Sequence, residues 1–376
     1  MRLKRVSKFI KPLTKDLLET QIATISQVTC GMLTNESLSL AEIARGFETE
    51  VDFRHNLKRV ERFVSNPRIS QRPDSQEPDA PLTVSERVAR RLVRQLRRRL
   101  KLAKKAPLEI ILDWTSVGVF QVLSALVGVE GRAVPILQWS LKKWDLKDSQ
   151  NAFEYRLLES LRRIVGTGGR AVIVADRGFG RTELFRFLDQ LGFLYCIRVK
   201  GDAWVEFTGY EGKLRDYEVT VGQTFKLSRV RYHKHKRYEV KLAITCTRIK
   251  GKAKTWLLAT NLPSSARQIV EVYRRRFWCE ENFRDLKQAF RLEKTRVETP
   301  QRLDALLLAV SLVFLILALV GVRAEKLGYA TKLACRKKGK KVLSWCALAL
   351  KLLRKSTKHL NLLFDNSADC LGIHWA

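Results

Sequence analysis

One continuous apolar segment constrains this chain more than any other feature. Residues 305–322, ALLLAVSLVFLILALVGV, contain a single Ser and no charged residue over 18 positions. A helix that is apolar on every side must be buried, either in a bilayer or inside a large domain. The chain has no second segment of this kind, and strongly basic sequence lies on both sides of it. We therefore favour a helix buried in a large globular domain over a membrane span.

The 376 residues suffice for two or three domains around such a helix. Their charge is unusual, because 71 Lys and Arg against 38 Asp and Glu give a formal net charge of +33. A polyanion would relieve this self-repulsion, so the charge favours a nucleic-acid partner. A ribosomal or chromatin-like protein, or a bias towards solubility, is the alternative. The seven Cys and five His lack metal-ligand or disulfide spacing, which fits a reducing cytoplasm.

The N-terminal sequence predicts a small helical domain over residues 1–65. Lys58, Arg59 and Arg62 lie close together on one helix surface there, which suits DNA binding. A basic solvated face would look the same. Residues 66–84 are rich in Pro and have no apolar periodicity, so they predict a linker.

A very basic helix is predicted next, over residues 85–105. Its apolar residues repeat every four positions and form one stripe, which consists of Val88, Leu92, Leu96 and Leu100. The stripe should pack on the following domain. The remaining positions are crowded with cations, and we expect Arg94, Arg97 and Arg98 to face a phosphate backbone.

The period changes at residue 107, where short apolar runs begin. Up to residue 201 the predicted order is β-β-β-α-β-α-β, with a hairpin turn at Glu130-Gly131, so the fold class is α/β with a mixed sheet. Three further regions complete the chain: an all-β insertion, a second part of the core that starts with a long helix from about 265 to 291, and a basic helical C-terminal tail. The predicted boundaries are 85–201 and 263–325 for the core, 202–262 for the insertion and 326–376 for the tail.

Two acidic residues follow apolar strands in this core. Asp113 ends LEIILD, and Asp176 ends AVIVAD. A carboxylate at the end of a strand can hold a hard cation, although a single Asp there is more often a turn former or a helix cap. Two of them on neighbouring strands suggest a site without establishing one.

The stretch YRRRFWCEENFRDLK, residues 273–287, adds a third acidic candidate. At about 100° per residue, Tyr273, Arg276, Glu280 and Lys287 fall within about 60° of one another on a helix, whereas Glu281 points elsewhere. A ladder of salt bridges on a helix surface is the alternative, since Arg276 and Glu280 have the i, i+4 spacing of such pairs. Such a ladder would not need Tyr273.

These residues carry a family resemblance. The spacing Y-x2-R-x3-E-x6-K resembles the signature of the insertion sequence four family of bacterial transposases, which belong to the DDE class. DWT at 113–115 and ADRGFG at 175–180 are similar to the contexts of the two aspartates of that family. The resemblance is close over roughly residues 107–300 and looser in the tail.

The resemblance implies a ribonuclease-H-like catalytic core whose catalytic and metal-binding residues are Asp113, Asp176 and Glu280. It also implies that Tyr273, Arg276 and Lys287 bind phosphates near the scissile bond. Trp256, in TWLLATN, matches a tryptophan that stacks on a flipped base in hairpin-forming relatives. A core tryptophan of a β-sheet is an equal alternative.

By the same resemblance, two Mg²⁺ ions, or Mn²⁺ as a substitute, would support phosphoryl transfer on DNA. Asp113 would bridge both ions, and Asp176 and Glu280 would each bind one. The implied function is cleavage at the ends of an insertion sequence and joining to target DNA. The expected partners are double-stranded DNA, as inverted-repeat ends and target, and a second copy of the chain in the synaptic complex. We expect a cytoplasmic, nucleoid-associated bacterial protein.

Three alternatives stay open. One is a metal-dependent nuclease that uses the same core without strand transfer. Another is a non-enzymatic DNA-binding protein derived from a transposase, against which the intact Asp113, Asp176 and Glu280 argue. The last is a membrane protein anchored at 305–322.

Overall fold

The computed structural model describes residues 2–73, 81–99, 107–147, 149–166, 171–249, 251–333 and 343–364. The chain divides into two compact units. Unit 1 comprises Met1–Lys104, Trp114–Phe153 and Trp278–Ala376, and unit 2 comprises Lys105–Asp113 and Glu154–Phe277. The predicted domains do not follow this division, because the N-terminal helices share unit 1 with parts of the predicted core and tail.

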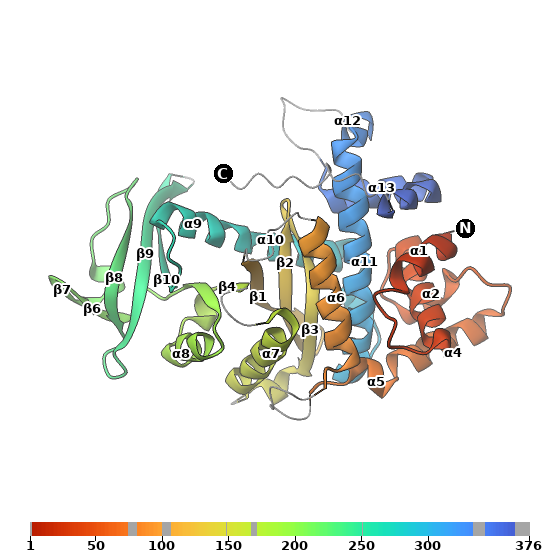
Figure 1. Cartoon of the computed structure of the whole chain (residues 1–376), viewed down its shortest axis with the longest axis horizontal. Helices are drawn as coiled ribbons and strands as arrows, with labels where there is room; N and C mark the ends of the chain where they lie inside the picture. The colour runs from red at the N-terminus through yellow and green to blue at the C-terminus, as the bar shows by residue number, and fades with distance from the viewer. Residues whose placement is uncertain are drawn as a thin grey trace. The chain divides into compact units, whose positions relative to one another are not determined.

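Unit 1 is mainly helical (Figure 1). Its N-terminal helices are α1 (Arg2–Ile10), α2 (Glu19–Asn35), α3 (Leu40–Arg45), α4 (Phe53–Val64), α5 (Pro67–Ser70) and α6 (Val84–Arg99). Its strands are β2 (Phe120–Val129) and β3 (Arg132–Lys142), followed by the short helix η1 (Lys143–Leu146). Its C-terminal elements are α10 (Trp278–Gln288), η5 (Leu292–Lys294), α11 (Pro300–Lys326), α12 (Tyr329–Leu333), α13 (Trp345–Lys355) and η6 (Thr357–Leu363).

Strands β2 and β3 form the predicted antiparallel hairpin. Val129 pairs with Arg132, and the two residues between them, Glu130 and Gly131, have φ angles of 42° and 86°. Two consecutive left-handed residues define the turn that matches the natural twist of a hairpin. Both strands are buried along almost their whole length, which is why their sequences read as apolar runs.

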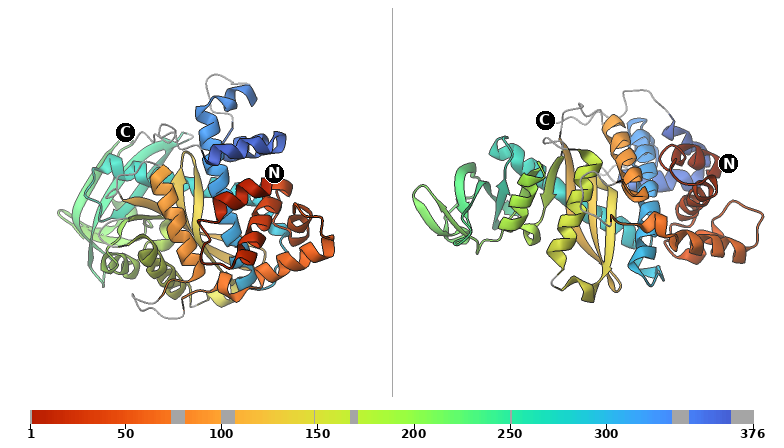
Figure 2. Two further views of the ribbon diagram at one scale, coloured as in Figure 1. Left: turned by 45° about the vertical axis from the view of Figure 1, so that its right-hand side comes forward. Right: turned by 60° about the horizontal axis from the view of Figure 1, so that its bottom comes forward.

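Helix α11 is the core of unit 1. It begins at the cap residue Thr299, whose side chain accepts a hydrogen bond from the backbone N–H of Arg302. Among the described residues it is the helix long and apolar enough to cross a membrane, yet its most apolar window is completely buried. Helices α2, α4, α5 and α13 and strand β3 pack against it (Figure 2). Gly321 permits the close approach of α13, because a Cβ there would overlap the carbonyl oxygen of Trp345. The structure thus supports the buried-helix interpretation.

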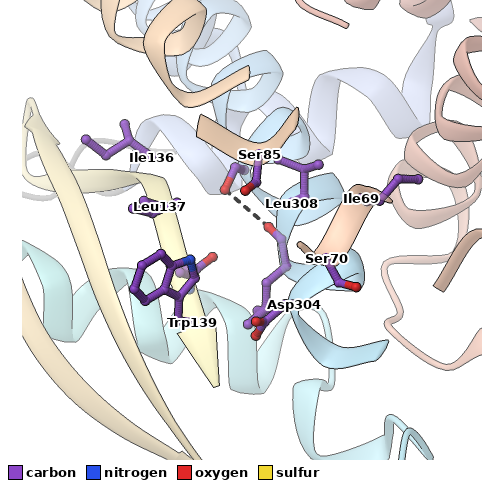
Figure 3. A pocket seen from close by; sticks show the side chains of 11 residues that line it. Ile69, Ser70, Ser85, Ile136, Leu137, Trp139, Asp304 and Leu308 are labelled. Carbon is purple, nitrogen blue, oxygen red and sulfur yellow. Dashed lines mark hydrogen bonds between the residues drawn. The ribbon is translucent and has the colours of Figure 1, made fainter. Parts of the chain in front are cut away.

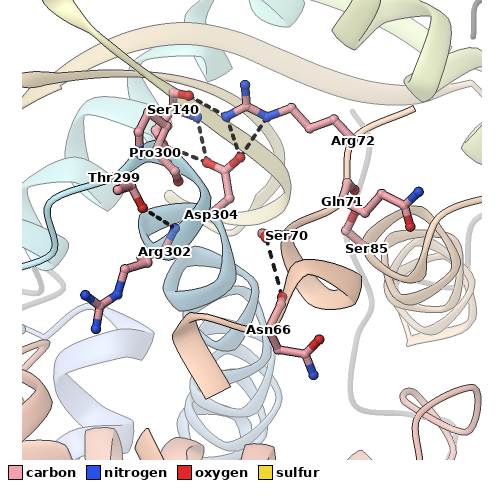
Figure 4. Close-up of polar contacts among 10 residues, drawn as sticks. All are labelled: Asn66, Ser70, Gln71, Arg72, Ser85, Ser140, Thr299, Pro300, Arg302 and Asp304. Carbon is pink, nitrogen blue, oxygen red and sulfur yellow. Dashed lines mark hydrogen bonds and ion pairs between the residues drawn. The ribbon is translucent and has the colours of Figure 1, made fainter. Parts of the chain in front are cut away.

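A buried ionic network ties the segment after α5 to α11 and β3 (Figure 4). Arg72 Nε donates to Asp304 Oδ2 at 2.8 Å, while the backbone N–H and the hydroxyl of Ser140 both donate to Asp304 Oδ1 at 2.7 Å. Arg72 also donates to the carbonyl of Ser140. Burial raises the pKa of Asp304, although Arg72 and Ser140 oppose that shift.

Residues 66–84 were predicted to be a linker, and the structure corrects this prediction in part. Asn66 caps α5, Ile69 and Ser70 of that helix are buried, and α6 already begins at Val84. The local signal of the prolines could not reveal a salt bridge to Asp304, which lies 232 positions away from Arg72. Residues 74–80 lie outside the described part of the chain.

Close to this network, α5, α6, β3 and α11 enclose a cavity of about 20 Å³ (Figure 3). Asp304 and Leu308 of α11 face Trp139 and Leu137 of β3 across it. Such a volume holds about one water molecule. The cavity is therefore too small to be a substrate site.

Unit 2 is built on a mixed sheet with the strand order β1-β4-β5-β10-β9-β8-β6-β7. Strands β1, β4 and β5 are parallel, and from β5 onwards the neighbours are antiparallel. The strands are β1 (Leu108–Val117, which enters unit 1 after Asp113), β4 (Ala171–Ala175), β5 (Leu194–Arg198), β6 (Trp204–Phe207), β7 (Tyr210–Lys213), β8 (Thr224–Tyr232), β9 (Tyr238–Ile249) and β10 (Lys252–Thr260). The helices are α7 (Gln150–Val165, from Glu154 onwards), η2 (Arg177–Phe179), α8 (Thr182–Gln190), η3 (Leu214–Asp216), α9 (Ala266–Arg274) and η4 (Arg275–Phe277).

The order of strands and helices predicted for residues 107–201 is confirmed. The strands predicted over 202–262 are also present, as β6 to β10. Their sheet is continuous with the parallel strands, since Leu258 of β10 pairs with Arg198 of β5.

The single helix predicted from about 265 to 291 is wrong. Helix α9 does begin directly after the cap residue Ser265, whose side chain accepts a hydrogen bond from the N–H of Gln268 in a capping box. It ends at Arg274, and the 3-10 turn η4 separates it from α10, which ends at Gln288. A 3-10 turn advances by about 120° per residue instead of 100°. The uniform count that placed Tyr273, Arg276, Glu280 and Lys287 on one face therefore does not apply.

Candidate active site

The two predicted aspartates come directly after the paired stretch of the parallel strands β1 and β4. Asp176 follows the end of β4 as predicted, whereas Asp113 does not end its strand, because β1 continues to Val117. Leu112 of β1 pairs with Ala175 of β4 in the last rung of their ladder, and Asp113 and Asp176 are the residues that directly follow this rung. The apolar residues before them are buried, and both aspartates are half-buried at the edge of that core. The Asp176 carboxylate accepts a hydrogen bond of 2.8 Å from the backbone N–H of Gly178, which fixes the turn after β4.

A third charged residue, Arg198, ends the next parallel strand at the same level. Ala175 pairs with Ile197 of β5, so Arg198 follows on the rung of Asp176. Its charge also acts on the hydroxyl of Tyr273. Arg198 was not among the residues predicted from the sequence. The signal was present, because Arg198 ends the apolar strand FLYCIR just as the two aspartates end theirs.

Arg276 binds the carboxylate of Asp113. Its Nη1 donates to Asp113 Oδ2 at 3.2 Å, and the Arg276 and Asp113 side chains are 9% and 17% exposed. The guanidinium lies 4.7 Å from the ring centroid of Phe277, within the range of a cation–π contact. The arginine is therefore embedded in the protein, and the aspartate that it binds is the more accessible partner.

Tyr273 is part of the core beneath this pair. Its side chain is 1% exposed and packs edge-on against Trp256 at 5.2 Å between ring centroids. Burial raises the pKa of Tyr273, and the positive charges of Arg276 and Arg198 oppose that shift. Tyr273 supports Arg276 from the side of the core. Because Tyr273 is buried, it offers little surface to a phosphate.

Trp256 lies in the same apolar cluster and is 8% exposed. It pairs with Thr245 across β9 and β10, and its ring also contacts Phe277 at 5.8 Å between centroids. Its indole N–H is buried and has no hydrogen-bond partner in the described part of the chain. This packing matches the alternative that Trp256 is a core tryptophan of the β-sheet. Its stacking on a flipped base stays a prediction.

Glu280 and Lys287 belong to α10, which is part of unit 1. Glu280 is exposed in the first turn of the helix, and Lys287 is half-buried in the last turn. The neighbouring Glu281 has a structural role, because it forms ion pairs with Arg132 at 3.0 Å and Arg284 at 2.8 Å. The two adjacent glutamates thus have different surroundings.

The basic helix α6 also lies in unit 1. Val88, Leu92 and Leu96 are buried as the predicted stripe requires, and Leu100 is outside the described residues. Arg94 and Arg98 are exposed and Arg97 is half-buried. The helix therefore presents cations to solvent along the side opposite its apolar stripe.

The donor set of unit 2 suits a divalent cation in part. Asp113 and Asp176 provide hard carboxylate oxygens on adjacent strands, which is the chemistry that Mg²⁺ and Mn²⁺ prefer. Within the described residues no group of three His, Cys, Asp or Glu side chains is close enough to hold a metal ion. The two aspartates fit as a pair, and a third protein ligand stays a prediction.

Comparison with known proteins agrees with this geometry. Residues 105–316 match the family model described as the transposase DDE domain, which covers more than half of the 376 residues. A comparison with curated proteins gave no significant match. The matched region contains both aspartates, Arg276 and Glu280. The chain therefore belongs to the family of the transposase DDE domain.

Proposed function

We propose that this protein is a transposase that binds the ends of an insertion sequence, cleaves the DNA backbone and joins the ends to target DNA. The observation that carries the proposal is that Asp113 and Asp176 directly follow the last paired rung of β1 and β4, with Arg276 bound to the first aspartate. Assignment to the insertion sequence four family is part of the proposal, and it depends on the Y-x2-R-x3-E-x6-K spacing.

In this proposal Asp113 and Asp176 hold divalent cations, and Glu280 completes the ligand set. When bound, the cations activate the attacking oxygen and stabilise the leaving oxygen of the phosphodiester. The protein's own part is positioning and charge, since phosphoryl transfer depends mainly on these. Arg276 and Lys287 bind phosphate oxygens near the scissile bond, and Arg198 adds positive charge beside Asp176.

The surroundings of Arg276 suit it to that role. Its guanidinium is held by an aromatic ring and by Asp113, so little conformational freedom is lost when a phosphate binds. A phosphate would share the arginine with the aspartate. The positive charge of Arg276 would then reduce the repulsion between the DNA and the acidic pair. Tyr273 supports Arg276 and donates to a phosphate if its hydroxyl becomes accessible on binding.

Trp256 stacks on a flipped base if the reaction passes through a DNA hairpin. A folded Trp256→Ala variant that forms hairpins at the wild-type rate would remove it from the site. We further propose that two copies act in the synaptic complex, and that the protein works in the bacterial cytoplasm on the nucleoid.

Two adjacent glutamates provide the test. Glu280→Gln should reduce Mg²⁺-dependent nicking of an end-containing duplex by at least about a thousandfold, because a metal ligand is lost. Its affinity for the duplex and its melting temperature should stay near those of the wild type. Glu281→Gln is the matched control. It should keep the nicking rate and lose roughly 1 kcal/mol of stability with its ion pairs to Arg132 and Arg284.

If Glu281→Gln is inactive and Glu280→Gln is active, the signature has been assigned to the wrong glutamate. If both nick normally, α10 carries no catalytic residue, and the proposal fails. Joining of a pre-cut 3′-OH end to plasmid DNA then separates a transposase from a nuclease with the same core.

A further inference from the structure

A second carboxylate of β1 holds a second arginine of the η4 turn. Glu109 precedes Asp113 by four residues, so both side chains lie on the same face of the strand. Arg275 Nε donates to Glu109 Oε2 at 2.7 Å, and Arg275 Nη2 donates to Glu109 Oε1 at 2.6 Å. Two parallel hydrogen bonds between a guanidinium and a carboxylate form the strongest and most directional type of ion pair.

The Glu109–Arg275 pair is largely buried, with side chains 13% and 23% exposed. Burial raises the pKa of Glu109, and the positive charge of Arg275 opposes that shift. An ionised Glu109 without its arginine would be costly at this depth, so the two groups depend on each other. The pair is not a surface contact that solvent could replace.

The two ion pairs fasten one short turn to one strand at two points. Arg275 and Arg276 are consecutive in η4, whereas their partners are four residues apart in β1, or about 13 Å along an extended strand. The interruption of the predicted long helix falls at these two arginines. Arg276 thus reaches Asp113 from a turn whose first residue is already fixed.

Resting on the proposed function, we propose that Glu109 and Arg275 are positioning residues for the site. Their ion pair holds η4 against β1, and thereby keeps the guanidinium of Arg276 on the carboxylate of Asp113. The pair acts through Arg276 and does not touch the reacting atoms. Its loss would free Asp113 of part of its neutralising charge and would leave Arg276 without a fixed position for phosphate.

Arg275→Lys tests this inference, because Lys keeps the charge but cannot form the two parallel hydrogen bonds. Glu109→Gln is the companion variant, which keeps the shape and removes the charge. Circular dichroism selects the variants that fold. Arg274→Ala is the matched control, since Arg274 is adjacent in the chain and its ion pair with Glu271 is half-exposed on both sides.

Three quantities are measured on the full-length protein: Mn²⁺ affinity by electron paramagnetic resonance without DNA, affinity for an end-containing duplex, and the nicking rate. For Arg275→Lys we expect Mn²⁺ to bind about threefold more tightly, because Asp113 is less neutralised. Nicking should fall about tenfold through the displaced Arg276. Duplex affinity should change little, and Arg274→Ala should match the wild type in all three.

Unchanged Mn²⁺ affinity in both folded variants, with nicking that falls only with the folded fraction, would mean that the pair is merely structural. The proposed function fails separately. If the wild type does not nick, the Mn²⁺ comparison still decides about the positioning role. A wild-type protein that binds no Mn²⁺ at all overturns both.

Discussion

Two arginine–aspartate pairs in this protein have opposite patterns of burial. In unit 1 the acid is the deeper partner, because Asp304 is 6% exposed and Arg72 is 21% exposed. In unit 2 the arginine is deeper, since Arg276 is 9% and Asp113 is 17% exposed. A carboxylate deep in a core, such as that of Asp304, can only stabilise the fold. An acid at the edge, held by an arginine from inside, can also meet a ligand from solvent.

The hydrogen bonds differ in the same direction. Both oxygens of Asp304 accept short hydrogen bonds, from Arg72 and from two donors of Ser140. Arg276 approaches Asp113 at a longer 3.2 Å. A buried carboxylate with short hydrogen bonds on both oxygens stabilises a fold, whereas a carboxylate nearer the solvent is more accessible to a cation. This contrast supports the proposal that Asp113 belongs to the active site, while Asp304 belongs to the core.

The largest effect should come from breaking the contrast on the functional side. Asp113→Asn should lower the nicking rate by about a thousandfold or more, roughly 4 kcal/mol in the barrier. The melting temperature should fall less than in Asp304→Asn, because the relieved repulsion between Asp113 and Asp176 offsets part of the cost of leaving Arg276 without its counter-charge. Rates on an end-containing duplex and a thermal melt measure the two quantities. A large fall in the melting temperature would show that Asp113 is as structural as Asp304.

The same substitution in the other pair should have the opposite result. Asp304→Asn leaves Arg72 without its counter-charge, which should cost about 3 kcal/mol and lower the melting temperature by roughly 5–10 °C. The nicking rate per folded molecule should not change. Asp216→Asn is the control, because its pair with Arg215 is exposed and should contribute almost nothing. Equal melting temperatures for both variants would remove the structural half of the contrast.

The smallest of the three effects concerns the arginines of α6. Replacing Arg94, Arg97 and Arg98 of α6 by Gln should weaken DNA binding about tenfold near physiological salt, and lower the slope of log K against log salt by up to about 2.7. Replacement by Lys is the control and should keep the slope. If the slope is unchanged after replacement by Gln, α6 does not bind phosphate.

Much of the sheet could be predicted because its signals are local. The runs that end at Asp113 and Asp176 mark buried strands, and residues that end neighbouring parallel strands meet at one edge. Asp113 and Asp176 directly follow the last paired rung of β1 and β4, in agreement with that reasoning, although β1 itself continues to Val117. Arg198 follows the same rule and could have been found by applying it once more.

The rest depends on contacts that no local pattern contains. The η4 turn interrupts a sequence that is helical in period, because Glu109 and Asp113 attract two consecutive arginines from more than 160 positions away. Arg72 finds Asp304 over a still longer separation, inside a segment whose prolines predict a linker. Long-range charge pairing overrode local propensity in both places.

The burial of α11 also has a consequence for synthesis on the ribosome. Helices α2, α4 and α5 pack against α11, which begins 230 positions after α5 ends at Ser70. At 5–20 residues per second, the nascent N-terminal helices wait roughly 10–50 s for the helix that completes their core. During that time their apolar faces are available to chaperones. A truncated chain that ends before residue 300 would lack α11 and would be a basic, incomplete bundle. Such a fragment should aggregate, and it should not compete with the full-length chain for DNA.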